Sequence, residues 1–250
     1  MPPSYDFAAV PSIVIPLGPN AAIDAHQHPQ HQLTWAPDGV LMMEVDDSRF
    51  VLQRARALWI PGGTPHAVLP TASYAMLSLF FDPADCPLDW LGPTVVDATG
   101  LVGPLLTHLV DLPHDRTAER ARAAAVLWDL LTPLSVTTIP TILPTDAQAK
   151  KVALAIRKNP ADNRGLDAWG RVVGASARTL SRRFHAETGI AFDRWRTLQR
   201  LNAALPLLGA GDPIVRVARA VGYATPSAFI AAFRREIGTT PAAYFTAEGG

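Results

Sequence analysis

Residues 174–184 read Gly-Ala-Ser-Ala-Arg-Thr-Leu-Ser-Arg-Arg-Phe, and this stretch decides the fold of the second half of the chain. Ser176 is a favourable N-cap, and a helix that begins after it places Leu180 and Phe184 on one apolar face. A shorter apolar stripe precedes Gly174 and consists of Leu166, Trp169, Val172 and Val173. Two amphipathic helices separated by a short turn at a glycine predict a helix-turn-helix.

The opposite face of the second predicted helix carries side chains suited to contacting DNA. It is formed by Arg178, Ser181, Arg182 and His185. An arginine guanidinium can pair bidentately with the edge of a guanine in the major groove, and neighbouring cations can contact phosphates. The competing interpretation is a solvated helix face with ordinary basic residues, and a second copy of the motif weakens that interpretation.

The helix-turn-helix pattern is duplicated. Four positions recur 48 or 49 residues later, where Gly174, Phe184, Gly189 and Trp195 return as Gly222, Phe233, Gly238 and Tyr244. In the second copy, Thr225 and Pro226 supply the cap and the first-turn proline of its second helix. A helix predicted over residues 192–208 joins the copies and spans roughly 25 Å at ~1.5 Å per residue. That length suits two helices entering major grooves ~34 Å apart.

Charge divides the chain near the same place. Residues 1–145 carry 6 Lys/Arg against 14 Asp/Glu, a net charge of −8, whereas residues 146–250 carry 16 against 8, a net charge of +8. A basic half of this size favours a polyanionic partner. Two domains that simply differ in surface composition would give the same division, so charge alone leaves both interpretations open.

The first half is rich in short strand-like runs. Those at residues 40–45, 49–52 and 76–81 are separated by turn signals such as the prolines and glycines of residues 37–39 and 61–63. This spacing predicts a β-sandwich or small barrel, and residues 101–134 predict flanking helices. The proline-rich stretch that follows predicts a linker. We therefore expect domains at residues 1–134 and 147–250, joined by a linker at 135–146.

Some classes of protein are disfavoured by composition. No apolar run approaches the ~18 residues that a membrane helix requires, and the first residues lack the basic start and apolar core of a signal peptide. Cys86 is the single cysteine, so no internal disulfide is expected. These features predict a cytoplasmic protein with no membrane partner.

The motif at 174–184, followed by Gly189, by Arg219-Ala-Val-Gly-Tyr at 219–223 and by residues 229–241, resembles the AraC/XylS family of bacterial transcription regulators. The resemblance covers residues 150–245 and implies two helix-turn-helix units that bind adjacent major grooves of double-stranded DNA. It also implies a homodimer formed through the helices at 101–131, and RNA polymerase as a further partner. The residues predicted to contact DNA are Ser176, Arg178, Thr179, Ser181, Arg182, Arg183, Thr225, Pro226, Ser227, Ala231, Arg234 and Arg235.

Three positions depart from the pattern of this family. Ala231 stands where relatives often carry a polar or basic residue, which predicts that the second unit grips the DNA backbone more than the bases. Pro206 lies inside the predicted joining helix, where it removes a backbone hydrogen bond and favours a kink. Gly170 replaces a small alanine and is expected to weaken its helix slightly.

A candidate metal site lies in the first half. His26 and His28 are two residues apart, so on a strand they face the same side. Together with Gln32 and the run Pro-Gly-Gly-Thr-Pro-His at 61–66, they resemble the two motifs of cupins. The implied pocket residues are His26, His28, Gln32 and His66, with glutamine where metal-binding cupins usually have glutamate. Three imidazoles and an amide oxygen suit a divalent ion such as Zn, Fe, Ni or Mn, and the cofactor is otherwise unknown.

Three interpretations of these histidines stay open: a metal site, a metal-free pocket for a small-molecule effector, and buried histidines with no ligand. His31 is expected to face away and to be structural. The whole pattern predicts a sequence-specific transcription regulator, without enzymatic activity, whose cupin domain senses a small molecule or a metal ion. The alternative is a metal-dependent cupin enzyme fused to a DNA-binding module. Gln32 in place of an acidic ligand counts against that alternative.

The expected fold class is therefore a two-domain α+β protein. Its N-terminal part is a cupin-like β-barrel with flanking helices, and its C-terminal part is an all-α double helix-turn-helix domain.

Overall fold

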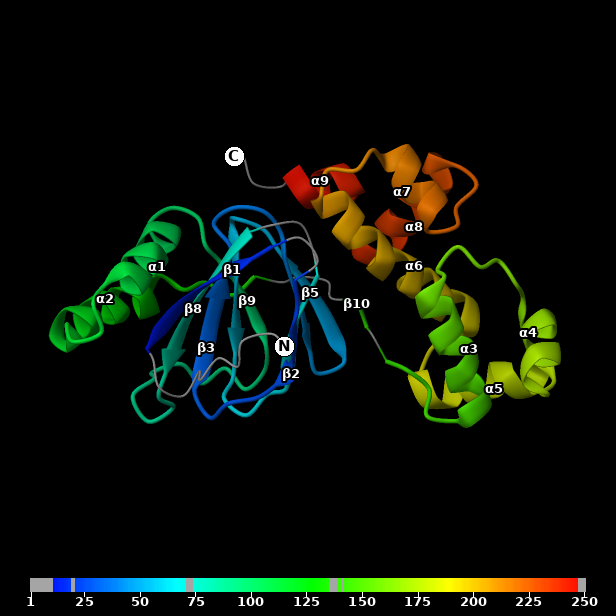
Figure 1. Ribbon diagram of the computed structural model, residues 1–250, viewed down its shortest axis with the longest axis horizontal. Coiled ribbons are helices and arrows are strands. Elements are labelled where there is room, and N and C mark those ends of the chain that lie inside the picture. The colour runs from blue at the N-terminus through cyan, green and yellow to red at the C-terminus, as the bar shows by residue number, and fades with distance from the viewer. Residues whose placement is uncertain (1–10, 19–20, 71–73, 135–138, 141, 247–250) are drawn as a thin grey trace. The chain divides into compact units, whose positions relative to one another are not determined.

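The computed structural model describes residues 11–18, 21–70, 74–134, 139–140 and 142–246 (Figure 1). The chain falls into two compact units that separate between residues 136 and 137, with residues 47–49 grouped with the second. Strands and two helices build the first unit, and the second is mainly helical. The chain is thus a two-part α+β protein, as predicted. Residues 135–138 and 141 of the predicted linker lie outside the described residues.

Two antiparallel sheets make up the β-rich part. One sheet has the strand order β1-β8-β3-β6-β9, and the other has the order β10-β5-β4-β7-β2. The strands are β1 (Ser12–Leu17), β2 (Ile23–His26), β3 (His31–Trp35), β4 (Leu41–Val45), β5 (Ser48–Leu52), β6 (Arg56–Ile60), β7 (His66–Leu69), β8 (Tyr74–Phe81), β9 (Thr94–Asp97) and β10 (Ile139–Pro140).

An apolar core fills the space between the two sheets. Ile15 and Leu58 of the first sheet belong to the same buried cluster as Leu41, Met43 and Leu52 of the second. A second apolar cluster covers the other face of the first sheet, where α1 (Val102–Asp111) and α2 (Thr117–Leu130) pack. Figure 1 shows both helices beside that sheet. The predicted flanking helices at 101–134 are confirmed.

The sheets remain separate ladders over the described residues, because no strand pair there joins one sheet to the other. The strands therefore form two facing layers and are not closed by hydrogen bonds into a ring. His26 and His66 belong to one layer, whereas Gln32 belongs to the other. The two layers thus bring the predicted pocket residues together from opposite sides.

The second unit contains two similar helical halves. Its helices are α3 (Ala147–Lys158), α4 (Leu166–Val173), α5 (Ala177–Thr188), α6 (Phe192–Gly209), α7 (Ile214–Ala220), α8 (Pro226–Ile237) and α9 (Pro241–Thr246). In the first half, Leu180 and Phe184 of α5 pack with Trp169 and Trp195 in one buried cluster. In the second half, Phe229 and Phe233 are buried and contact each other with ring centroids 5.9 Å apart.

The joining helix is α6, which agrees with the prediction over 192–208. It is helical through Pro206 as far as Gly209, and Ala210 N–H donates to the Pro206 carbonyl at 3.0 Å. Trp195, Leu201 and Leu205 are buried along it. The α4–α5 pair and the α7–α8 pair are therefore carried by one continuous element.

Gly170 has a second role, in the turn between α4 and α5. A Cβ at this position would overlap the backbone carbonyl of Ala175. Ala175 N–H donates to the Gly170 carbonyl at 3.0 Å, where the chain turns from α4 into α5. Glycine at position 170 therefore lets this turn close, and its expected weakening of the helix stays a prediction.

No helix in the described part of the chain is long and apolar enough to cross a membrane.

Candidate functional site

The orientation of α5 follows from its N-terminal cap and its buried face. Gly174 adopts a left-handed conformation, with φ of 71°, and ends α4. The Ser176 hydroxyl accepts a hydrogen bond from Thr179 N–H at 3.0 Å and caps α5. Leu180 and Phe184 are completely buried, which fixes the helix about its axis. The face opposite these two residues is therefore held toward solvent.

That outward face carries the arginines predicted to read bases. Arg178, Ser181, Arg182 and His185 are exposed, and with Thr179 they line one hollow in the surface. Neither Arg178 nor Arg182 forms an ion pair with a described residue. Both guanidinium groups are thus available for a bidentate contact with a planar acceptor such as a guanine edge.

Other arginines near α5 hold the protein together instead. Arg183 is half-buried and donates to Asp146 Oδ1 at 2.9 Å and to Gln148 Oε1. Asp146 is the N-cap of α3, so this contact ties α5 to α3. The structure therefore places Arg183, which was predicted to contact DNA, in an internal contact, and the prediction itself stays untested.

The arginines of α6 make further internal contacts. Arg194 pairs with Glu236, and Arg196 pairs with Asp193 and donates to the Arg164 carbonyl. Arg200 donates to the carbonyls of Pro160 and Asp162 and to Asn163 Oδ1. Their guanidinium groups are engaged within the helical unit.

The second helix-turn-helix presents a different surface on α8. Thr225 caps the helix by accepting from Ala228 N–H at 3.2 Å, and Pro226 occupies its first turn, as predicted. The exposed residues of α8 are Ser227, Ala228, Ala231, Arg234 and Arg235. The middle of this face is therefore small and apolar, and cations lie only toward its C-terminal end. Ala228 was not among the predicted contact residues, although its spacing of three from Ala231 places both on one helix face.

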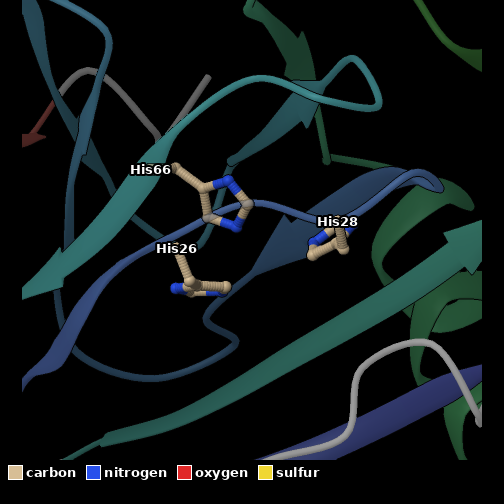
Figure 2. Close-up of side chains that lie close together, drawn as sticks. All are labelled: His26, His28 and His66. Carbon is tan, nitrogen blue, oxygen red and sulfur yellow. The ribbon is translucent and has the colours of Figure 1, made fainter.

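The three predicted histidines meet at one place (Figure 2). His26 ends β2, His66 begins β7, and the two residues are register partners in the sheet. The ring centroids lie 4.4 Å apart for His26 and His66, and 5.1 Å apart for His28 and His66. One ligand atom from each imidazole lies within 4.8 Å of the other two. Gln32, on β3, reaches the cluster from the opposite sheet.

The backbone fixes the tautomer of all three rings. The Nδ1 atoms of His26, His28 and His66 each lie 2.9 Å from a backbone carbonyl oxygen, those of Asp24, Gln30 and Thr64 respectively. A carbonyl can only accept, so each Nδ1 must carry the proton and donate it. In a neutral ring the Nε2 atom is then the unprotonated nitrogen, which is the form that binds a metal ion.

A directed chain of hydrogen bonds fixes the amide of Gln32. The Thr34 hydroxyl donates to the Leu77 carbonyl at 3.3 Å, and the Ser78 hydroxyl donates to Thr34 Oγ1 at 3.1 Å. Ser78 Oγ therefore accepts from Gln32 Nε2, at 2.9 Å. This leaves Gln32 Oε1 pointing at His28 Nε2, at 3.1 Å. Two acceptors thus face each other whenever His28 is neutral.

Burial keeps His28 and His66 neutral. His66 is 3% exposed and His28 is 8% exposed. Desolvation lowers the pKa of His66 to about 4, outweighing its hydrogen bond to Thr64. Desolvation likewise lowers the pKa of His28, against the opposing effects of Gln32 and Gln30. A second proton, on His28 Nε2, would allow a hydrogen bond to Gln32 Oε1, but the lowered pKa of His28 disfavours that protonated form.

The loop at 61–65 positions the histidine cluster. A Cβ on Gly62 would overlap the carbonyl of Pro29, so glycine is required for this close approach to the loop that carries His28. Gly63 N–H donates to the His28 carbonyl at 2.8 Å, and Gly62 N–H donates to His31 Nδ1 at 2.9 Å. The ring of His31 lies against Trp59, with centroids 4.9 Å apart. His31 thus supports this loop and is not one of the three clustered histidines.

Known proteins resemble the chain in both of its parts. Residues 169–247 match the family model of a helix-turn-helix domain. The chain is 30% identical over 225 residues to the HTH-type transcriptional regulator NimR of Escherichia coli, a match that covers 88% of this chain and 81% of NimR. The chain belongs to the AraC/XylS family of helix-turn-helix transcriptional regulators. The chain is also 41% identical over 108 residues to the HTH-type transcriptional regulator RipA of Corynebacterium glutamicum. That match covers 43% of this chain and 33% of RipA.

Among solved structures, the DNA-binding domain of AdpA in complex with a target DNA aligns with 41% of the regulator and 93% of its own chain, at 33% identity and a TM-score of 0.38. Family membership rests on the match to NimR, which is long enough to include both compact units. The chain is therefore a DNA-binding transcription regulator, and double-stranded DNA is its partner.

Proposed function

We propose that the regulator reads base edges mainly through α5, with Arg178 and Arg182 as the base-reading residues and Ser181 beside them. Their exposure and their freedom from ion pairs with described residues support this assignment. Ser176 and Thr179 lie at the N-terminus of the helix, where backbone N–H groups favour a DNA phosphate. A phosphate contact by Arg183 would require it to leave Asp146 and Gln148.

The second helix-turn-helix makes weaker base contacts in this proposal. Thr225, Pro226 and Ser227 approach the DNA at the start of α8, and Arg234 and Arg235 neutralise phosphates. Ala231 cannot form a hydrogen bond through its side chain, but a methyl group packs well against the C5-methyl of thymine. The two halves of a binding site should therefore differ, with guanine favoured under α5 and thymine under α8.

We also propose that the first unit is a cupin-type sensor whose cluster, formed by His26, His28, Gln32 and His66, binds a divalent metal ion. The observation that carries this proposal is the contact between His28 Nε2 and Gln32 Oε1, two acceptors 3.1 Å apart. A cation between them turns an unfavourable contact into two metal–ligand bonds. With bonds of ~2.1 Å, adjacent ligands of a metal lie about 3.0 Å apart in octahedral geometry and about 3.4 Å apart in tetrahedral geometry.

The metal-free alternatives fit less well. With each Nδ1 donating to a carbonyl, the cluster offers three Nε2 atoms and one amide oxygen, all of them acceptors. An organic occupant would need several hydrogen-bond donors, as a polyol or an ammonium group has. Catalysis is disfavoured because no carboxylate of the described residues belongs to the cluster, and its three histidines would be held as metal ligands and so could not transfer protons. We therefore assign the cluster to sensing. A second copy of the chain and RNA polymerase are further partners proposed from the family resemblance.

Metal analysis of the purified full-length regulator tests the sensor. We expect elemental analysis and native mass spectrometry to find about one divalent ion per chain, removable by a chelator. The matched variants are His66→Gln, which should lose the ion, and His31→Gln, which should keep it, because His31 lies outside the cluster. A wild-type protein that holds no ion after incubation with Zn, Fe, Ni or Mn would contradict the metal site.

A further inference from the structure

The ligand set of the proposed site carries no charge. A histidine binds a metal ion through a neutral imidazole, so His26, His28 and His66 would contribute no charge, and Gln32 presents an amide oxygen. Glutamate at position 32 would have supplied one negative charge. A divalent ion held by these four groups would therefore keep its full charge of two.

The side-chain amide of Gln32 is held with its oxygen, and not its nitrogen, toward the cluster. Its orientation is set by Ser78 and Thr34, both of which are completely buried. Turning the amide over would place its oxygen against Ser78 Oγ, whose proton is already donated to Thr34. The neutral oxygen is thus held at the cluster by the sheet beneath it.

No carboxylate of the described residues belongs to the cluster, so the ligands themselves do not compensate for the charge. The cluster contains histidines alone, and the charges that act on His66 come from His26 and His28. Phe80 lies edge-on to His28, with ring centroids 5.2 Å apart, so that side of the site is apolar. Burying an uncompensated dication among such groups is strongly unfavourable.

We infer that the effector of this regulator is a small carboxylate or related oxyanion that binds the metal ion directly and neutralises it. This inference rests on the metal site proposed above. His26 is half-buried whereas His28 and His66 are buried, so the anion would enter from the side of His26. The sensor then responds to the metal and the anion together, because each stabilises the binding of the other.

The full-length regulator loaded with Co²⁺ tests the inference, because the visible spectrum of Co²⁺ changes when its ligands change. Acetate and inorganic phosphate are the oxyanion probes, and acetamide is the uncharged counterpart of acetate. We expect acetate or phosphate, but not acetamide, to change the spectrum and to increase the apparent Co²⁺ affinity measured by equilibrium dialysis. A response to acetate alone would assign a carboxylate, and a response to phosphate alone would assign an inorganic oxyanion.

The variant Gln32→Glu supplies the missing charge within the protein. This variant should still bind Co²⁺. It should bind the anion about tenfold or more weakly than the wild type does, because the metal is already partly neutralised. If this variant does not fold, the dependence of the wild-type Co²⁺ affinity on acetate still decides the matter. Co²⁺ binding that is indifferent to both anions would overturn the inference and leave the metal site standing. Failure to bind Co²⁺ at all would overturn both.

Discussion

At the scale of single residues, the arginines of the helical unit have two kinds of surroundings. Arg178 and Arg182 present exposed guanidinium groups on α5, whereas Arg183 and Arg200 donate to several groups of the protein. Sequence spacing does not separate these groups well, because Arg182 and Arg183 are adjacent in the chain. Their substitutions should consequently have different effects.

Arg178→Ala or Arg182→Ala should weaken binding to a preferred DNA site by about 1–3 kcal/mol and relax base preference at one position, because a bidentate contact is lost. The thermal midpoint of unfolding should not change. Arg183→Ala should instead lower the stability of the helical unit, because it leaves Asp146 and Gln148 without this partner. Quantitative binding to a randomised DNA library, with calorimetry on the same proteins, measures both effects. The assignment fails if Arg178→Ala and Arg182→Ala both retain wild-type base preference.

His66 gives the metal-free regulator a defined pH dependence. Its pKa is about 4 in the folded protein and ~6.5 when unfolded, so the unfolded state binds the proton more readily between these values. Stability should therefore be highest above pH 6.5 and fall as the pH decreases toward 4. From pH 7 to pH 5 the loss should be about 2 kcal/mol.

Denaturant unfolding of the chelator-treated protein at pH 7 and pH 5, followed through the first unit, measures this loss. His66→Gln should show a smaller decline, with the remainder due to His28, whose pKa is lowered in the same direction. Equal declines for the wild type and the variant would show that His66 is not the buried neutral group described here.

At the scale of elements, two glycines and one arginine determine how neighbouring segments pack. Gly170 allows α4 and α5 to meet, and Gly62 allows the loops around His28 and His66 to meet. Arg200 ties α6 to residues 160–163, and its guanidinium lies 5.5 Å from the ring centroid of Tyr223 in the second half. The contacts of Gly62 and Arg200 link segments that are distant in sequence, whereas Gly170 acts within the turn between two consecutive helices.

Gly170→Ala should destabilise the helical unit by about 1–3 kcal/mol, because the added methyl group overlaps the Ala175 carbonyl and forces the turn to open. The control is Gly165→Ser, which places a side chain in open space at the N-cap of α4, where serine is favourable. Thermal unfolding of both variants makes the comparison. Equal stability of Gly170→Ala and the wild type would contradict the close approach.

Arg200→Lys keeps the positive charge but cannot reproduce the forked contacts of the guanidinium with Pro160, Asp162 and Asn163. We expect a loss of about 1–3 kcal/mol in the free energy of unfolding. Arg219→Lys is the control, because Arg219 is exposed on α7. If the two substitutions have the same small effect, Arg200 does not link these segments.

The helical elements were predictable because each has local signals. The caps at Ser176 and Thr225, the glycines that end α4, α5 and α8, and the apolar stripes all act over a few residues. The tautomers of the histidines and the orientation of Gln32 were not predictable. The tautomers depend on how the folded backbone orients the carbonyls of Asp24, Gln30 and Thr64. The orientation of Gln32 depends on Ser78, which is 46 residues away in sequence and is brought beside it by strand pairing. The need for glycine at position 170 likewise depends on a close approach to Ala175 that only the folded turn reveals.

At the scale of the whole molecule, an acidic half that we propose to be a sensor and a basic DNA-binding half belong to one chain. A bound metal ion can change DNA binding only if it binds two conformations of the regulator with different affinities. We expect the chelated and metal-loaded regulator to differ in affinity for the same DNA site, with the difference absent from His66→Gln. Fluorescence anisotropy with labelled DNA measures it. Identical DNA affinities with and without metal, in the presence and absence of acetate or phosphate, would show that the histidine cluster does not regulate DNA binding.

The most direct test of the central claim is the affinity of the full-length regulator for a site selected from random double-stranded DNA, measured over a range of salt concentrations. We expect a preferred site, a steep decrease of affinity with salt as counterions are released from phosphates, and loss of the site preference in the double variant Arg178→Ala/Arg182→Ala. Binding with no preferred site, or a double variant that selects the same site as the wild type, would contradict the assignment of α5 as the base-reading helix.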